Sequence, residues 1–123
     1  MALYDRVMET STTTGTGNIT LDGPVAGFQA VVDAVGGGTG AGSFPYVIEA
    51  VDADSIPTGE WEVGEGELSG GSTMVRRVVY RSSNSNALVS FAAGTKRVFI
   101  SEAAHSARTF GQSYACNRGM DLP

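Results

Sequence analysis

The chain has 123 residues and a formal net charge of -5, with 41% hydrophobic residues and 17 glycines. This length suits one domain that buries about two thirds of the surface of its unfolded chain. The acidic balance argues against nucleic-acid binding, which needs clustered Lys and Arg, and no apolar run reaches the roughly 18 to 20 residues of a membrane span. Cys116 is the single cysteine, so an internal disulfide and a cysteine-based metal site are excluded.

The glycine content, together with abundant Thr and Ser, predicts an all-β fold, a compact antiparallel β-sandwich or barrel. Near the N-terminus, the β-branched polar residues 10–14 predict a solvent-facing strand, with a docking arm as the alternative. The polar and apolar alternation of residues 18–21 predicts a half-buried strand. The apolar positions of residues 28–35 fit a short helix or a strand, and we favour a strand.

The glycine-rich stretch 36–42 predicts a flexible loop and not a phosphate-binding loop, because no Lys-Ser or Lys-Thr pair follows it. Residues 46–51 then form a run with strong β propensity, which predicts a strand. Asp52 and Asp54 come directly after it, but they lack the spacing and the distal Glu of a calcium-binding EF-hand. We therefore interpret them as turn residues.

The middle of the chain, residues 60–101, predicts an antiparallel meander. Its first two strands, 61–68 and 73–81, flank the pair Gly70 and Gly71. Two glycines suit a two-residue hairpin turn, because both central residues can adopt positive φ without a Cβ clash. Two further runs, 87–91 and 96–101, complete the predicted meander.

A turn at Gly70 and Gly71 fixes the strand register by counting outward. The resulting pairs match acid with base and apolar with apolar: Glu65 with Arg76, Glu60 with Arg81, Val63 with Val78, and Trp61 with Tyr80. One face of the hairpin then carries a predicted structural core that consists of Trp61, Val63, Val78 and Tyr80.

The sequence contains no pattern that indicates catalysis, so we expect no enzyme, no cofactor and no metal site. His105 is the single histidine, and residues 111–115 match a nucleophile elbow only loosely. Glycoside hydrolysis needs two acids that face each other across a cleft. The predicted strand pairing instead favours salt bridges for the acids of the first hairpin strand, which are Glu60, Glu62, Glu65 and Glu67.

The strand pattern is lost toward the C-terminus, so we predict a β-domain over residues 1–104 and a docking tail over residues 105–123. Aromatic and methionine side chains are enriched at the centres of interfaces. The expected anchors of the tail on another chain are therefore Phe110, Tyr114 and Met120. In this docked state Cys116 would be shielded.

A second expected contact is the Thr-rich stretch 10–16, and within it the threonine segment with Thr12, Thr13 and Thr14. A small sheet leaves edge strands with unpaired backbone groups, which readily pair with a neighbour. We therefore expect a homo-oligomer or a subunit of a symmetric assembly.

Several short segments also stand in a distinctive order along the chain. They are residues 3–10 leading into 12–17, the run GPVAGF at 23–28, WEVGEG at 61–66, residues 77–84, and FAAGTKRVF at 91–99. Together, over residues 3–102, they resemble a small structural module of tailed-bacteriophage virions. The glycine-rich stretch 36–42 is an insert relative to that module.

The resemblance implies a free-standing virion protein or the first domain of a tail-fibre or spike chain, with no catalytic residues. We expect a non-enzymatic protein made in the host bacterial cytoplasm and exposed on the particle, where it mounts a fibre or spike or decorates the head. Its partners would be other virion proteins, with no nucleic acid and no membrane.

The alternative is a carbohydrate-binding β-module that contacts the host cell surface. Its exposed aromatics would be Phe44, Tyr46 or Tyr114, stacked on sugar rings. Trp61 and Tyr80 discriminate between the two hypotheses. If they are buried together they belong to the core, whereas exposure on a sheet makes them a binding platform.

Overall fold

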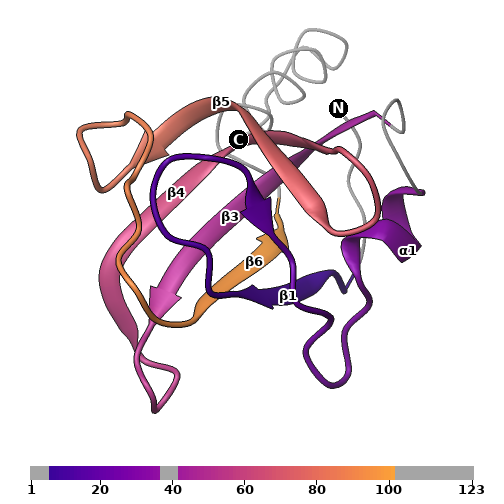
Figure 1. Ribbon diagram of the computed structural model, residues 1–123, viewed down its shortest axis with the longest axis horizontal. Coiled ribbons are helices and arrows are strands. Elements are labelled where there is room, and N and C mark those ends of the chain that lie inside the picture. Colours follow the sequence, from indigo (N-terminus) through magenta and orange to yellow (C-terminus); the bar gives the residue numbers. More distant parts are fainter. Residues whose placement is uncertain (1–5, 37–41, 102–123) are drawn as a thin grey trace, which may run out of the picture.

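The computed structural model describes residues 6–36 and 42–101. These residues form the elements β1 (Met8–Ser11), β2 (Ile19–Thr20), α1 (Val31–Val35), β3 (Ser43–Val51), β4 (Pro57–Leu68), β5 (Thr73–Ser82) and β6 (Lys96–Ile100). The strands make one antiparallel sheet in the order β1-β6-β3-β4-β5-β2, which curls into a nearly closed barrel (Figure 1). The predicted all-β antiparallel class is confirmed.

Backbone hydrogen bonds join the two ends of the sheet. Segment 22–25 follows β2 in the chain and lies along β1, where Asp22 donates its N–H to the carbonyl of Thr10 over 2.8 Å. Thr10 in turn donates to the carbonyl of Gly23 over 3.3 Å. The other side of β1 pairs with β6, so β1 is bonded on both sides. This closure protects backbone groups that an open sheet would expose.

The core fills the inside of this barrel. Burying a large apolar side chain stabilises the fold by about 1.5–3 kcal/mol, and most strands contribute such residues to the core. The apolar side chains that are fully shielded from solvent are Ile19, Val31, Phe44, Tyr46, Ile48 and Met74. Phe91, in the segment before β6, is 2% exposed and extends this core.

The strand prediction for residues 28–35 is wrong, because this region contains the helix α1. Val31, its first residue, is fully buried, and its N–H donates to the carboxylate of Glu9 over 2.7 Å. Glu9 also accepts the N–H of Gly23 over 3.0 Å. A buried carboxylate thus satisfies an N–H group that the first helical turn leaves unpaired, and the local sequence pattern does not reveal this distant partner.

The predicted hairpin of β4 and β5 is present, but its predicted register is wrong. The two strands are joined by a four-residue loop, 69–72, and the first pair is Leu68 with Met74 instead of Leu68 with Thr73. Two irregularities then shift the pairing further, so that Glu62 lies opposite Ser82. Such bulges insert an extra residue into one strand and cannot be obtained by counting outward from a turn.

The third strand of the predicted meander, residues 87–91, is also wrong. Ala87 and Phe91 make isolated bridges, to Asn84 and Gly15 respectively, and no strand forms between them. The reason lies at Val89, whose backbone is bonded to buried side chains of the barrel and not to a neighbouring strand. The strands predicted at 46–51 and 96–101 are confirmed as β3 and β6.

Candidate functional site

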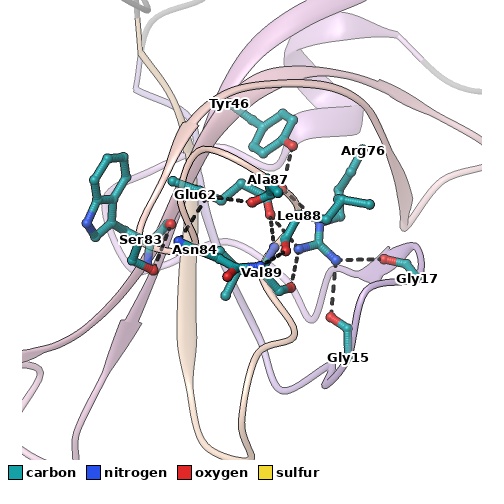
Figure 2. Close-up of polar contacts among 12 residues, drawn as sticks. Gly15, Gly17, Tyr46, Glu62, Arg76, Ser83, Asn84, Ala87, Leu88 and Val89 are labelled. Atoms are coloured by element: carbon teal, nitrogen blue, oxygen red, sulfur yellow. Dashed lines mark hydrogen bonds and ion pairs between the residues drawn. The ribbon is translucent and has the colours of Figure 1, made fainter.

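A buried ion pair between β4 and β5 is the most distinctive polar feature of the described structure (Figure 2). The Arg76 guanidinium binds both oxygens of the Glu62 carboxylate, with Nε to Oε2 at 2.9 Å and Nη2 to Oε1 at 2.6 Å. The Arg76 side chain is 2% exposed and that of Glu62 is fully buried. This two-bond geometry is the strongest form of pairing between arginine and a carboxylate.

Two further donors complete the coordination of the Glu62 carboxylate. The Tyr46 hydroxyl donates to Oε2 over 2.6 Å, and the backbone N–H of Val89 donates to Oε1 over 2.8 Å. Each carboxylate oxygen therefore accepts two hydrogen bonds. A carboxylate can accept about four, so Glu62 has no unused lone pair.

The remaining donors of Arg76 bind backbone carbonyls from two other parts of the chain. Nη1 donates to Gly15 and Gly17, each over 3.1 Å, and Nη2 donates to Val89 over 2.6 Å. Arginine has five N–H groups, and all five are used. The guanidinium carbon also lies 5.3 Å from the centre of the Phe91 ring. We call Tyr46, Glu62, Arg76 and their backbone partners the buried charge network.

Glycines of β4 make room for the Tyr46 ring in this network. Tyr46 pairs directly with Gly64, and the ring also reaches Gly66. A Cβ on Gly64 would collide with the Val78 carbonyl oxygen and would lie 2.9 Å from the Tyr46 hydroxyl. Burial, followed by the hydrogen bond to Glu62, raises the pKa of Tyr46 well above its ordinary range. Tyr46 therefore stays protonated as a donor.

The buried charge network ties β3, β4 and β5 to the loops around Gly15 and Val89. Since its donors and acceptors are saturated by the protein itself, its role in the described structure is to fix the positions of these segments. A fully satisfied network of this kind rigidifies a core and specifies one arrangement. It supplies a rigid frame for the surfaces on either side of it.

The predicted core of Trp61, Val63, Val78 and Tyr80 is wrong, because these side chains lie on the outer face of the barrel. Trp61 is 38% exposed and Val78 is 41% exposed, while Val63 and Tyr80 are partly exposed. Successive side chains of a strand point to opposite faces. The burial of Glu62 inside the barrel therefore sends its neighbours Trp61 and Val63 outward.

We call these four residues the β4–β5 outer face. Across the sheet it continues through Val47, which pairs with Val63, and through Glu49, which pairs with Trp61. Burial, and then the charge of Glu65, raises the pKa of the Tyr80 hydroxyl. Glu65 pairs with Val78 and Arg81 pairs with Val63, so apolar, aromatic and charged side chains are interleaved on this face.

The threonine segment does not continue β1, which ends at Ser11. Thr12 and Thr14 are exposed, and the Thr13 hydroxyl accepts the N–H of Thr20 over 2.9 Å. The expectation of a free edge strand at this segment is wrong, because Thr10 is bonded on both sides. The predicted contact through Thr12 to Thr14 rests on their side chains and stays a prediction.

Phe110, Tyr114 and Met120 lie outside the described residues, as do His105, Cys116 and the boundary at residue 104. Phe44 and Tyr46, two aromatics proposed for sugar stacking, are fully buried. Their assignment as exposed binding residues is wrong.

A surface groove of about 390 Å³ lies where β4 begins and β5 ends. Its walls come from the start of β4 and from the chain that follows β5, and the lining residues are Gly59, Glu60, Ser83, Asn84, Val89 and Ser90. Sequence reasoning missed both this groove and the buried charge network. A signal for the network does exist in β4, where Glu62 shares its strand face with Gly64, Gly66 and the buried Leu68.

Comparison with known proteins adds no family to this description, since no family model, no curated protein and no solved structure matches the chain. Among the described residues, no three His, Cys, Asp or Glu side chains are grouped so that they could hold a metal ion. No helix within residues 6–36 and 42–101 is long and apolar enough to cross a membrane.

Proposed function

We propose that this chain is a non-enzymatic structural protein of a bacteriophage particle. In this proposal it lies on the particle exterior, where it mounts a tail fibre or spike or decorates the head, and it contacts other virion proteins through the β4–β5 outer face. The order of the segments that resemble a virion module supports the class of protein. The observation that carries the contact surface is the exposure of Trp61 and Val78 on the barrel, and the same exposure keeps Trp61 and Tyr80 available as the binding platform of the carbohydrate-binding alternative.

The β4–β5 outer face has the composition of a protein interface. Trp and Tyr are enriched at interface centres, and buried Trp and Tyr anchors contribute a large share of binding free energy. Here Trp61 and Tyr80 are accompanied by two valines. Charged residues lie between these side chains, with Glu65 opposite Val78 and the exposed Arg81 opposite Val63. Charged groups beside aromatic anchors can form the direct hydrogen bonds that contacts between proteins also contain.

Particles assembled with single variants of this chain test the proposal. We expect Trp61→Ala to fold, because the indole lies outside the core, and to be depleted in purified particles relative to the parent chain. Ile56→Ala is a matched control, since Ile56 is 57% exposed but lies in the turn between β3 and β4. Quantitative mass spectrometry of the particles gives the copy number of each chain.

Two results would contradict the proposal. Absence of the parent chain from purified particles would reject a virion role altogether. Incorporation of Trp61→Ala at the level of the parent and of Ile56→Ala would reject the β4–β5 outer face as the contact surface.

A further inference from the structure

A row of apolar side chains crosses the outside of the sheet from β1 to β4. The strand pairing places Met8 opposite Phe99, Phe99 opposite Val47, and Val47 opposite Val63. Directly paired residues point to the same face of a sheet, so the other three side chains lie outside the barrel with Val63. All four are partly exposed. We call this set the outer apolar row, which is about 14 Å long because neighbouring strands lie about 4.8 Å apart.

A second row, beside the first, carries opposite charges at its centre. Two residues from Phe99 and Val47 along their strands, Arg97 of β6 lies opposite Glu49 of β3, and their side chains form an ion pair at 2.8 Å. Both side chains are 29% exposed, so both can contact a molecule that lies on this face. The centre of the outer face thus consists of an apolar pair next to a charged pair.

The outer apolar row is self-complementary under a two-fold axis that runs between β6 and β3, parallel to the strands. In a symmetric dimer the same surface of both copies forms the contact. This axis exchanges β6 with β3 and β1 with β4. Phe99 then faces Val47 of the second copy, and Met8 faces Val63 of the second copy. Apolar side chains therefore meet apolar side chains along the whole row.

The same axis brings unlike charges together. Arg97 faces Glu49 of the second copy, and Glu49 faces Arg97 of the second copy. Away from the outer face, the solvent-accessible charged side chains of the described residues are mainly acidic; they are Asp22, Asp33, Asp52, Asp54 and Glu60, with Arg6 as the one base. Two copies of a chain with a net charge of -5 repel each other over such a surface. Contact between copies is therefore favoured where acids and bases balance.

We infer that the outer apolar row joins two copies of this chain in a symmetric dimer. The copies meet face to face, because β1 is bonded on both sides and offers no free edge for a strand of the second copy. The outside of a barrel is convex, so the contact is closest along the axis between β6 and β3. Trp61 and the side chains of β5 lie away from this axis and stay available for the particle contact. The dimer therefore goes beyond the proposed function and does not depend on it.

Light scattering coupled to size-exclusion chromatography of the full chain tests this inference. We expect the parent chain to have the mass of two chains at micromolar concentrations. Arg97→Glu places like charges opposite each other in both halves of the contact, so it should weaken the dimer by about tenfold or more, and Glu49→Arg should do the same. An equimolar mixture of the two variants again places unlike charges across the axis. The mixture should therefore regain the mass of two chains, which a variant that fails to fold could not do.

Arg77→Glu is the matched control, because Arg77 forms an exposed ion pair with Glu67 outside both rows, and this variant should keep the mass of the parent. The inference is overturned if the parent chain has the mass of one chain, or of three or more. It is also overturned if Arg97→Glu keeps the parent mass, if Arg77→Glu loses it, or if the mixture stays monomeric.

The dimer and the proposed function can fail separately. A monomeric parent chain that enters particles through Trp61 overturns the dimer alone. A dimeric parent chain that is absent from particles overturns the virion role alone.

Discussion

Glu62 and Arg76 show how a charged pair can occupy the inside of a small barrel. Transfer of each ion out of water costs several kcal/mol in free energy, and mutual attraction recovers this only when the geometry is good and the remaining lone pairs and protons are bonded. Here both conditions are met, because Tyr46, Val89 and the carbonyls of the Gly15 loop complete the bonding. The pair is therefore compatible with a stable fold only when both partners are present, since removal of either partner leaves a buried charge.

Glu62→Ala tests this dependence. The variant leaves the Arg76 guanidinium buried without its counter-charge, and we expect the free energy of unfolding to fall by about 3–5 kcal/mol. Glu67→Ala removes a partner from the exposed pair with Arg77, and it should change the free energy of unfolding by about 1 kcal/mol or less. Urea denaturation of both variants measures the difference. Equal, small losses for the two variants would show that the buried charge network does not stabilise the barrel.

At the scale of elements, β4 is shaped by its inward-facing glycines as much as by its apolar residues. Gly64 and Gly66 lie beneath the Tyr46 ring, which brings the Tyr46 hydroxyl to Glu62 on the same strand face. A glycine in a strand interior weakens the strand by itself. Packing of the aromatic ring over the glycines offsets this loss.

Gly64→Ala is expected to destabilise the fold by at least about 1–3 kcal/mol, the usual cost of an overfilled core, because the added methyl group collides with the backbone of β5 and with Tyr46. Gly71→Ala is the control. Gly71 lies in the loop between β4 and β5, with open space where an added Cβ would lie. The melting temperature of the Gly71→Ala variant should therefore stay close to that of the parent. Equal melting temperatures for the Gly64→Ala and Gly71→Ala variants would refute the close approach of Tyr46 to β4.

The sequence could predict most strands but not how they pair or which face of β4 is buried. β propensity and the turn signal at Gly70 and Gly71 locate β3, β4, β5 and β6, because these signals depend only on neighbouring residues. The register of β4 and β5 depends on two bulges, and the orientation of β4 depends on Glu62 finding Arg76 on another strand. Residue type alone predicts that the apolar Trp61 faces the core and the charged Glu62 faces solvent. The structure shows the reverse. The groove depends on the start of β4 meeting the chain that follows β5, and it has no local signal.

At the scale of the whole molecule, buried polar side chains add long-range contacts to the backbone hydrogen bonds that close the barrel. Glu9 binds segment 22–25 and α1, and the buried charge network binds the loops around Gly15 and Val89. A change in protonation inside the barrel therefore alters the stability of the entire domain. Tyr46 is the member of the buried charge network whose pKa is shifted.

The pKa of Tyr46 is raised from its ordinary value of 10.0, mainly by burial and then by its hydrogen bond to Glu62. Unfolded tyrosine ionises near pH 10, whereas folded Tyr46 keeps its proton. Below pH 10 its contribution to stability is fully present, and above pH 10 it is progressively lost. Tyr80, whose pKa is also raised, adds to this loss, while Lys96 opposes it because its lowered pKa makes stability rise with pH up to about 10.5.

We therefore expect the free energy of unfolding of the parent chain to decrease as the pH rises above 10. Each proton released on unfolding contributes about 1.4 kcal/mol per pH unit. Tyr46→Phe should be less stable at neutral pH, because a buried oxygen of Glu62 loses a donor, but its alkaline decrease should be clearly shallower. Tyr80→Phe, which removes a hydroxyl from the outer face, is the control and should keep most of the parent slope. Urea denaturation from pH 8 to 12 measures these slopes, and a Tyr46→Phe slope equal to that of the parent would show that Tyr46 ionises equally well in the folded barrel.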